Sequence, residues 1–236
     1  MLDSRRGRYR RWDIHQRVQH WCLMTAFIVL VATGFPMRYA SAPAAQAITF
    51  FAGGAYTISI IHRFAGGLLI LTALYHIAYV GYHFMKGQHW TEMIPAWKDV
   101  TDFVQMWLYN LGGTKEKPKF GRWSFTEKFE YWGMVWGSAV MIVTGLLLWN
   151  PVLTIRVFPL AILLALSRVI HSYEALLAIT AINIWHLYHA HLRPDVFPMS
   201  EVWLTGLMSE EDMKEHHGLE YDRLVREHED HCETPD

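Results

Sequence analysis

Paired histidines inside long apolar runs are the feature that most constrains this chain. His62 and His76 lie 14 positions apart in one run, and His171 and His186 lie 15 positions apart in another. An ionisable side chain at membrane depth is costly, so it marks a functional site by default. On an α-helix, 14 residues span about 21 Å along the axis and return to within about 40° of the same face. Each run therefore predicts one helix that presents imidazoles at two depths.

Four apolar runs are long enough to cross a bilayer, which takes about 18 or more helical residues. Hydrophobic residues make up 52% of the 236-residue chain, and they are segregated into these runs. Because imidazole is the usual axial ligand of haem iron, the sequence predicts an all-α fold, an integral membrane four-helix bundle with haems between the helices. The four spans are expected at roughly 20–37, 58–84, 129–149 and 167–191.

Polar segments flank the predicted spans. Residues 90–110 read as an amphipathic helix on the cytoplasmic surface of the membrane. In the tail, Ser209 is followed by three acidic residues, which is typical of a helix N-cap and first turn. We therefore predict two domains, a membrane cytochrome b domain over 1–195 and a polar cytoplasmic tail over 196–236.

Lysine and arginine are concentrated on one side of the predicted topology. Cytoplasmic loops carry an excess of these residues. Here they gather before the first span and between the second and third spans, while the other two loops carry mainly Arg38 and Arg156. The distribution predicts that both termini are cytoplasmic.

Imidazole is the usual axial ligand of haem iron, and the predicted topology sorts the histidines by depth. His62 and His171 share an outer level and would hold one haem b. At the inner level His20, His76 and His186 compete for two positions. Arginine binds carboxylates through a fork of donors, so the haem propionates are expected to meet arginines at the outer ends of the spans. These arginines are Arg38, Arg63 and Arg168.

A third haem is an open alternative. If His76 pairs with His186, then His20 at the start of span one and His191 at the end of span four are left to bracket another porphyrin. His191 lies five residues past His186, about 7–8 Å along a helix, which would crowd two macrocycles unless they occupy different faces.

Other chemistry finds little support. There are two cysteines and no CxxCH, which excludes c-type haem attachment and a four-cysteine cluster within this chain. The chain has no glycine motif for dinucleotides, and nothing in it predicts a nucleic-acid partner. Electron transfer through bound haem is therefore the favoured function. A haem-free, histidine-lined transporter of protons or metal ions is the alternative, although the discontinuous helices typical of transporters are not predicted.

Four motifs together resemble the cytochrome b subunits of membrane-bound formate dehydrogenase, thiosulfate reductase and nickel–iron hydrogenase. They are RVQHW at 17–21, IIHRFAG at 60–66, VTGLLLWNP at 143–151 and VIHSYEALLAITAINIWHLY at 169–188. The resemblance implies a bacterial inner-membrane protein that passes electrons between quinone and an iron–sulfur or cytochrome c partner. It also implies that His62 and His171 hold the outer haem and that His20 and His186 hold the inner one.

Two features depart from this family pattern. The spacing of 15 between His171 and His186 exceeds the 14 that the family implies, so the rotation of His186 about its helix stays open. His76 has no counterpart in the formate dehydrogenase subunits. The tail from His191 onward resembles cytochrome b proteins that accompany multihaem c-type cytochromes.

Overall fold

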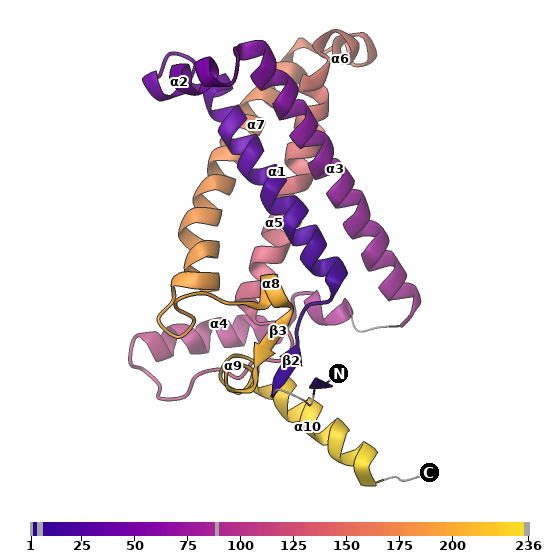
Figure 1. Cartoon of the computed structure of the whole chain (residues 1–236), viewed down its shortest axis with the longest axis vertical. Helices are drawn as coiled ribbons and strands as arrows, with labels where there is room; N and C mark the ends of the chain where they lie inside the picture. Colours follow the sequence, from indigo (N-terminus) through magenta and orange to yellow (C-terminus); the bar gives the residue numbers. More distant parts are fainter. Residues whose placement is uncertain (1, 4–6, 88–89, 234–236) are drawn as a thin grey trace. The chain divides into compact units, whose positions relative to one another are not determined.

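The computed structural model describes residues 2–3, 7–87 and 90–233, and its long elements are helices (Figure 1). Its contacts divide the chain into two compact units, each built from separate stretches of sequence. The bundle unit comprises His15–Tyr79 and Met134–Ser200, and the terminal unit comprises Met1–Ile14, Val80–Gly133 and Glu201–Asp236. The two-domain division at residue 195 stays a prediction.

Four long helical segments supply the bundle unit, and the ends of three of them belong to the terminal unit. They are α1 (Ile14–Arg38), α3 (Ala55–Met85), α5 (Phe125–Trp149) and α7 (Ala161–Thr180), the last extended by the π-helical segments η2 (Ala181–His186) and η3 (Tyr188–Leu192). All four are long and apolar enough to cross a membrane. The predicted all-α membrane fold is therefore confirmed, with each span reaching a few residues beyond its expected bounds.

The spanning helices bury few of their own apolar side chains. In the most apolar window of each span, between 6% and 17% of residues are buried inside the protein. Leu71, Ile77 and Leu177 are each more than 60% exposed. So much exposed apolar surface needs an apolar solvent, which the hydrocarbon core of a bilayer provides.

A short helix joins the first long helix to the second, and another joins the third to the fourth. Helix α2 (Pro43–Phe51) links α1 to α3, and α6 (Pro151–Val157) links α5 to α7. Both begin with proline, which suits the first helical turn because its missing N–H has no intrahelical partner there. Within the bundle unit α2 and α6 lie at the same end of the long helices (Figure 1). The bundle unit thus consists of two similarly built halves, α1–α2–α3 and α5–α6–α7.

The terminal unit contains a small antiparallel sheet that the sequence analysis did not predict. Strands β1 (Leu2–Asp3), β2 (Arg8–Arg10) and β3 (Leu207–Ser209) lie in that order, with Tyr9 opposite Met208. Strands of two or three residues are too short for the alternation of apolar and polar side chains to be visible. Their pairing joins segments about 200 positions apart, which no local pattern reports.

The remaining helices of the terminal unit are short or amphipathic. They are η1 (Trp90–Met93), α4 (Trp97–Asn110), α8 (Val202–Thr205), α9 (Glu210–His216) and α10 (Gly218–Glu233). Pro95 separates η1 from α4, because a proline disfavours the helical conformation of the residue before it. Helix α4 exposes an apolar face that includes Trp97, Val104 and Trp107, as expected of an amphipathic helix.

The predicted N-cap of the tail is confirmed. The Ser209 hydroxyl accepts a hydrogen bond of 3.0 Å from the backbone N–H of Asp212. The tail then forms two helices rather than one, because the chain leaves helical geometry at His217. The His217 ring is only 4% exposed, and its Nδ1–H donates to the carbonyl of Gly121 at 2.9 Å. This buried contact fixes the break.

A buried charge cluster joins the three stretches of the terminal unit. Arg11, 3% exposed, donates to the carbonyl of Arg122 at 2.6 Å, and Arg122 donates back to the carbonyl of Arg11 at 3.1 Å. Arg11 Nη2 also lies 3.2 Å from His217 Nε2 and 3.5 Å from a Glu127 carboxylate oxygen. On α10, Glu220 is 3% exposed and lies 3.6 Å from Arg122. Ionic contacts thus hold the tail against the segment that links α4 to α5.

We expect the docking of the tail to weaken as the pH falls. Burial, followed by the nearby Arg11, lowers the pKa of His217 from 6.5 to about 4. Between about pH 6.5 and 4 the undocked tail therefore binds a proton that the docked tail does not, so stability is lost as the pH falls through this window. Hydrogen exchange of the α10 amides, corrected for intrinsic rates, should rise across this range. His217→Gln should flatten the slope, and an unchanged slope in that variant would contradict the assignment to His217.

Candidate haem sites

The outer site is formed by two histidines that face each other from different helices. His62 lies on α3 and His171 lies on α7, and their ring centroids are 6.4 Å apart. Two imidazole nitrogens that each bind one metal ion at about 2.0–2.1 Å place the ring centroids about 6.3 Å apart. The spacing of the two rings therefore fits an iron atom held between them.

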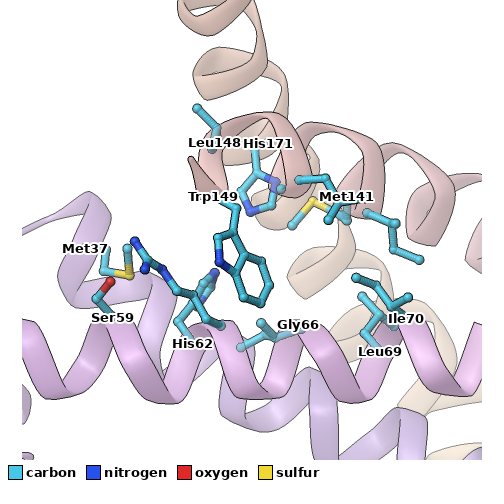
Figure 2. Close-up of a pocket in the computed structure, with 15 residues that line it drawn as sticks. Met37, Ser59, His62, Gly66, Leu69, Ile70, Met141, Leu148, Trp149 and His171 are labelled. Atoms are coloured by element: carbon cyan, nitrogen blue, oxygen red, sulfur yellow. The ribbon is translucent and has the colours of Figure 1, made fainter. Parts of the chain in front are cut away.

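An apolar pocket surrounds this pair, and Figure 2 shows His62 and His171 lining it together with Trp149. Its lining also includes Gly66, one turn after His62 on the same helix. A Cβ added at Gly66 would meet no heavy atom within 4 Å, so the pocket wall at this glycine leaves space for a flat ligand. Facing imidazoles, an apolar lining and an open glycine wall fit a bound porphyrin.

The three predicted propionate-binding arginines lie in different surroundings. Arg63 lines the outer pocket, and its guanidinium lies 5.9 Å from the centroid of the Trp149 ring. Arg38 lies 5.9 Å from the centroid of the Tyr173 ring, and Arg168 is exposed. Arg63 is therefore the arginine placed to meet a carboxylate at the pocket, while the roles of Arg38 and Arg168 stay predictions.

A second pair of facing histidines lies at the other level of the bundle unit. His20 on α1 and His186 at the end of η2 have ring centroids 6.4 Å apart, the same separation as the outer pair. His76 donates its Nδ1–H to Gln19 Oε1 at 2.7 Å, a bond that does not involve its Nε2, so the choice between His20 and His76 rests on the separation of the His20 and His186 rings. This arrangement favours His20 over His76 as the partner of His186.

The π-helical segment accounts for the unexpected spacing in the fourth span. Residues Ala181–His186 form η2, where hydrogen bonds run from residue i to i+5. A π turn takes up one more residue than an α turn, so 15 residues that include such a turn complete the same number of turns as 14 in an α-helix. His186 is thereby returned to the face that carries His171.

The other candidates in span four have separate surroundings. His191 lies on η3, five residues past His186. Glu174 lies against α5, where a Cβ added at Gly137 would come within 2.9 Å of its carboxylate oxygen. The absence of a side chain at Gly137 therefore makes room for this carboxylate.

Two threonines contact the histidines of the outer site, although the sequence did not predict a role for them. Thr33 Oγ1 lies 2.9 Å from His62 Nδ1, and Thr144 Oγ1 lies 2.9 Å from His171 Nδ1. Each threonine precedes a glycine, as VATGF and IVTGL. The repeated Thr-Gly pair at corresponding places in two spans was a visible signal, but its link to the histidines depends on tertiary contact.

The similarity to known proteins covers the residues of both sites. The family model for prokaryotic cytochrome b561 matches residues 11–197, which include every histidine of both sites. The formate dehydrogenase cytochrome b556(fdo) subunit of Escherichia coli K12 is 23% identical over 227 residues, covering 94% of this chain and 96% of the relative. The nitrate-inducible formate dehydrogenase cytochrome b556(Fdn) subunit of the same strain is 24% identical over 216 residues, covering 89% and 88%. With its four apolar spans, the chain belongs to the prokaryotic cytochrome b561 family and is a bacterial membrane cytochrome b that takes part in electron transfer.

Proposed function

We propose that this protein carries electrons between a quinone pool and a partner redox subunit through two haems b. The observation that carries the proposal is the presence of two facing histidine pairs, each with ring centroids 6.4 Å apart. His62 and His171 would hold the outer haem, and His20 and His186 the inner one. Both pairs are built from imidazoles on different helices, as bis-histidine ligation requires.

The chain sets the distance between the two sites. His171 and His186 follow one another along one continuous helical segment, so the rise of the helix separates the two levels by roughly 20 Å. A bound haem supplies one-electron chemistry at its iron. The four histidines would hold the two haem irons, and the apolar helices around them would exclude water and fix the separation of the two sites.

A partner must supply any chemistry other than that of the quinone. The relatives named above are subunits of formate dehydrogenases, which supports an iron–sulfur subunit as the immediate partner. The resemblance of the tail supports a multihaem cytochrome c instead. Co-purification with partner subunits decides between these two classes of partner.

We also propose that both termini are cytoplasmic, because lysine and arginine concentrate before span one and between spans two and three.

A polar cluster between α1 and α3 supports a quinone site beside the inner haem. His76 and Gln19 are hydrogen-bonded at 2.7 Å, and His15 Nδ1 lies 2.6 Å from the Tyr75 hydroxyl. Gln19 is 7% exposed, and among the described residues its amide Nε2 has no hydrogen-bond partner. Oxidation of a quinol to a quinone releases two electrons and two protons. The imidazoles can accept the protons, and Gln19 orients His76 through its amide oxygen.

We expect Gln19→Leu and His76→Gln to slow the reduction of the haems by a quinol. Loss of a positioned proton acceptor typically costs about 10²-fold or more. Stopped-flow absorbance at the haem α-band measures the rate, while dithionite reduction checks that haem content is unchanged. His83→Gln, farther along α3, is the matched control. Normal quinol rates in both variants would place the quinone elsewhere.

A reduced-minus-oxidised spectrum of the purified protein tests the proposal as a whole. Two b-type components that titrate separately and become reduced by a quinol are expected. A protein that contains no haem after expression with excess haem precursor would instead support a histidine-lined transporter. Haems that dithionite reduces but no quinol reduces, in membranes that contain the partner, would contradict the quinone assignment.

A further inference from the structure

Two Thr-Gly pairs, one in each half of the bundle unit, contact the two outer histidines in the same way. Thr33 and Gly34 lie on α1 and contact His62 of α3, and Thr144 and Gly145 lie on α5 and contact His171 of α7. In each half the pair is followed by a short proline-initiated helix, and then by the helix that carries the histidine. The intervals from threonine to histidine are 29 and 27 residues.

The direction of the threonine hydrogen bonds determines the histidine tautomer. The Thr33 hydroxyl donates its single proton to the carbonyl of Val29 at 2.6 Å, so it can only accept from the His62 ring. His62 must therefore carry its proton on Nδ1, which leaves the lone pair on Nε2 available for a metal.

The contact between Thr144 and His171 has the same hydrogen-bond directions. The Thr144 hydroxyl donates to the carbonyl of Val140 at 2.6 Å and lies 2.9 Å from His171 Nδ1. His171 is therefore also protonated on Nδ1, with Nε2 available. Both histidines that face each other at the outer site are thus held as the tautomer that axial ligation requires.

The glycines allow the imidazoles to lie directly against the neighbouring helix. A Cβ at Gly34 would lie 3.4 Å from Cε1 of His62, and one at Gly145 would lie 3.3 Å from Cε1 of His171. Contacts of 3.3–3.4 Å are tight, so an added methyl would push the ring. Each threonine thus limits rotation of its ring, while the glycine beside it permits the close approach.

We propose that Thr33–Gly34 and Thr144–Gly145 are positioning residues that fix both axial ligands of the outer haem and tune its potential. The inference rests on the proposed ligation by His62 and His171. A hydrogen bond accepted from the outer nitrogen of a ligating histidine orients the ring and raises its basicity. A more basic ligand stabilises ferric over ferrous iron, so these bonds lower the midpoint potential of the outer haem.

The test replaces each hydroxyl by a methyl group of similar shape. In Thr33→Val and Thr144→Val we expect the midpoint potential of one haem to rise while the other stays unchanged, and the affinity for that haem to fall about 10–100-fold. Redox titration and haem-transfer assays measure these two quantities. Thr33→Ser and Thr144→Ser should restore the wild-type potential, because serine keeps the hydroxyl.

Thr72→Val is the matched control. Thr72 is buried on α3, and its hydroxyl donates to the carbonyl of Leu68 at 2.8 Å without a histidine contact in the described contacts. If the loss of a buried threonine hydroxyl were itself the cause, the haem potentials and affinities would change equally in all three valine variants. A selective shift in Thr33→Val and Thr144→Val therefore separates ligand positioning from a general effect on packing.

Parallel alanine variants of the histidines separate failure of this inference from failure of the ligand assignment. If His62→Ala loses one haem but Thr33→Val and Thr144→Val leave both potentials and affinities unchanged, the positioning role is refuted and the ligation stands. If His62→Ala and His171→Ala keep both haems, the ligand assignment itself fails, and the positioning role fails with it.

Discussion

Replacing His62 or His171 by alanine is expected to remove one b-type haem per chain and leave the other in place. The two rings face each other from α3 and α7 at a separation that fits an iron between them, so either substitution removes half of the axial ligation. Pyridine haemochrome analysis against a protein assay should therefore fall from two haems per chain to one. The retained haem should keep its low-spin spectrum, because the inner pair lies one level away.

His83→Ala serves as a control for loss of a histidine on the same long helix. Full haem content and an unchanged spectrum in either His62→Ala or His171→Ala would refute the outer assignment. Loss of both haems in every variant, with the protein still folded by circular dichroism, would show that the two sites do not load independently.

The second large effect concerns the inner haem, where His20→Ala and His76→Ala are expected to differ. The ring centroid of His20 lies 6.4 Å from that of His186, the same separation as in the outer pair. We expect His20→Ala to convert the inner haem to a high-spin form or to lose it, and His186→Ala to do the same. We expect His76→Ala to retain two low-spin haems, as judged by electron paramagnetic resonance of the oxidised protein.

The reverse result would transfer the ligand role to His76 and revive the arrangement with three haems. In that arrangement His76 pairs with His186, and His20 pairs with His191. A ratio of three haems per chain, with one lost in His191→Ala, would establish it. The 6.4 Å separation of His20 and His186 instead favours two haems.

Several features of this protein were determined by local sequence alone. The four spans follow from hydropathy over windows of about 18 residues, because transfer of apolar side chains into hydrocarbon depends on composition rather than on packing. The Ser209 cap follows from a serine before three acidic residues, since the hydrogen bond it makes reaches only three positions ahead. The level of each histidine follows from the fixed rise of a helix.

Helix rotation and tilt are set by side-chain packing between helices, and local sequence does not report them. Three histidines share the inner level, and the tertiary structure is what brings the ring of His20 opposite that of His186. The extra residue between His171 and His186 left the direction of His186 open until the π-helical segment showed how the helix absorbs it.

Contacts between distant segments were likewise decided by the tertiary structure. The sheet of the terminal unit pairs residues from both ends of the chain, and its strands are too short for a periodic signal. Thr33 and Thr144 lie 29 and 27 residues from the histidines that they contact. A threonine in an apolar helix can satisfy its hydroxyl on its own backbone, so its sequence neighbours do not reveal a second partner on another helix. The sequence therefore determined which residues can ligate and at what depth, and the packing of the helices decided which of them face one another.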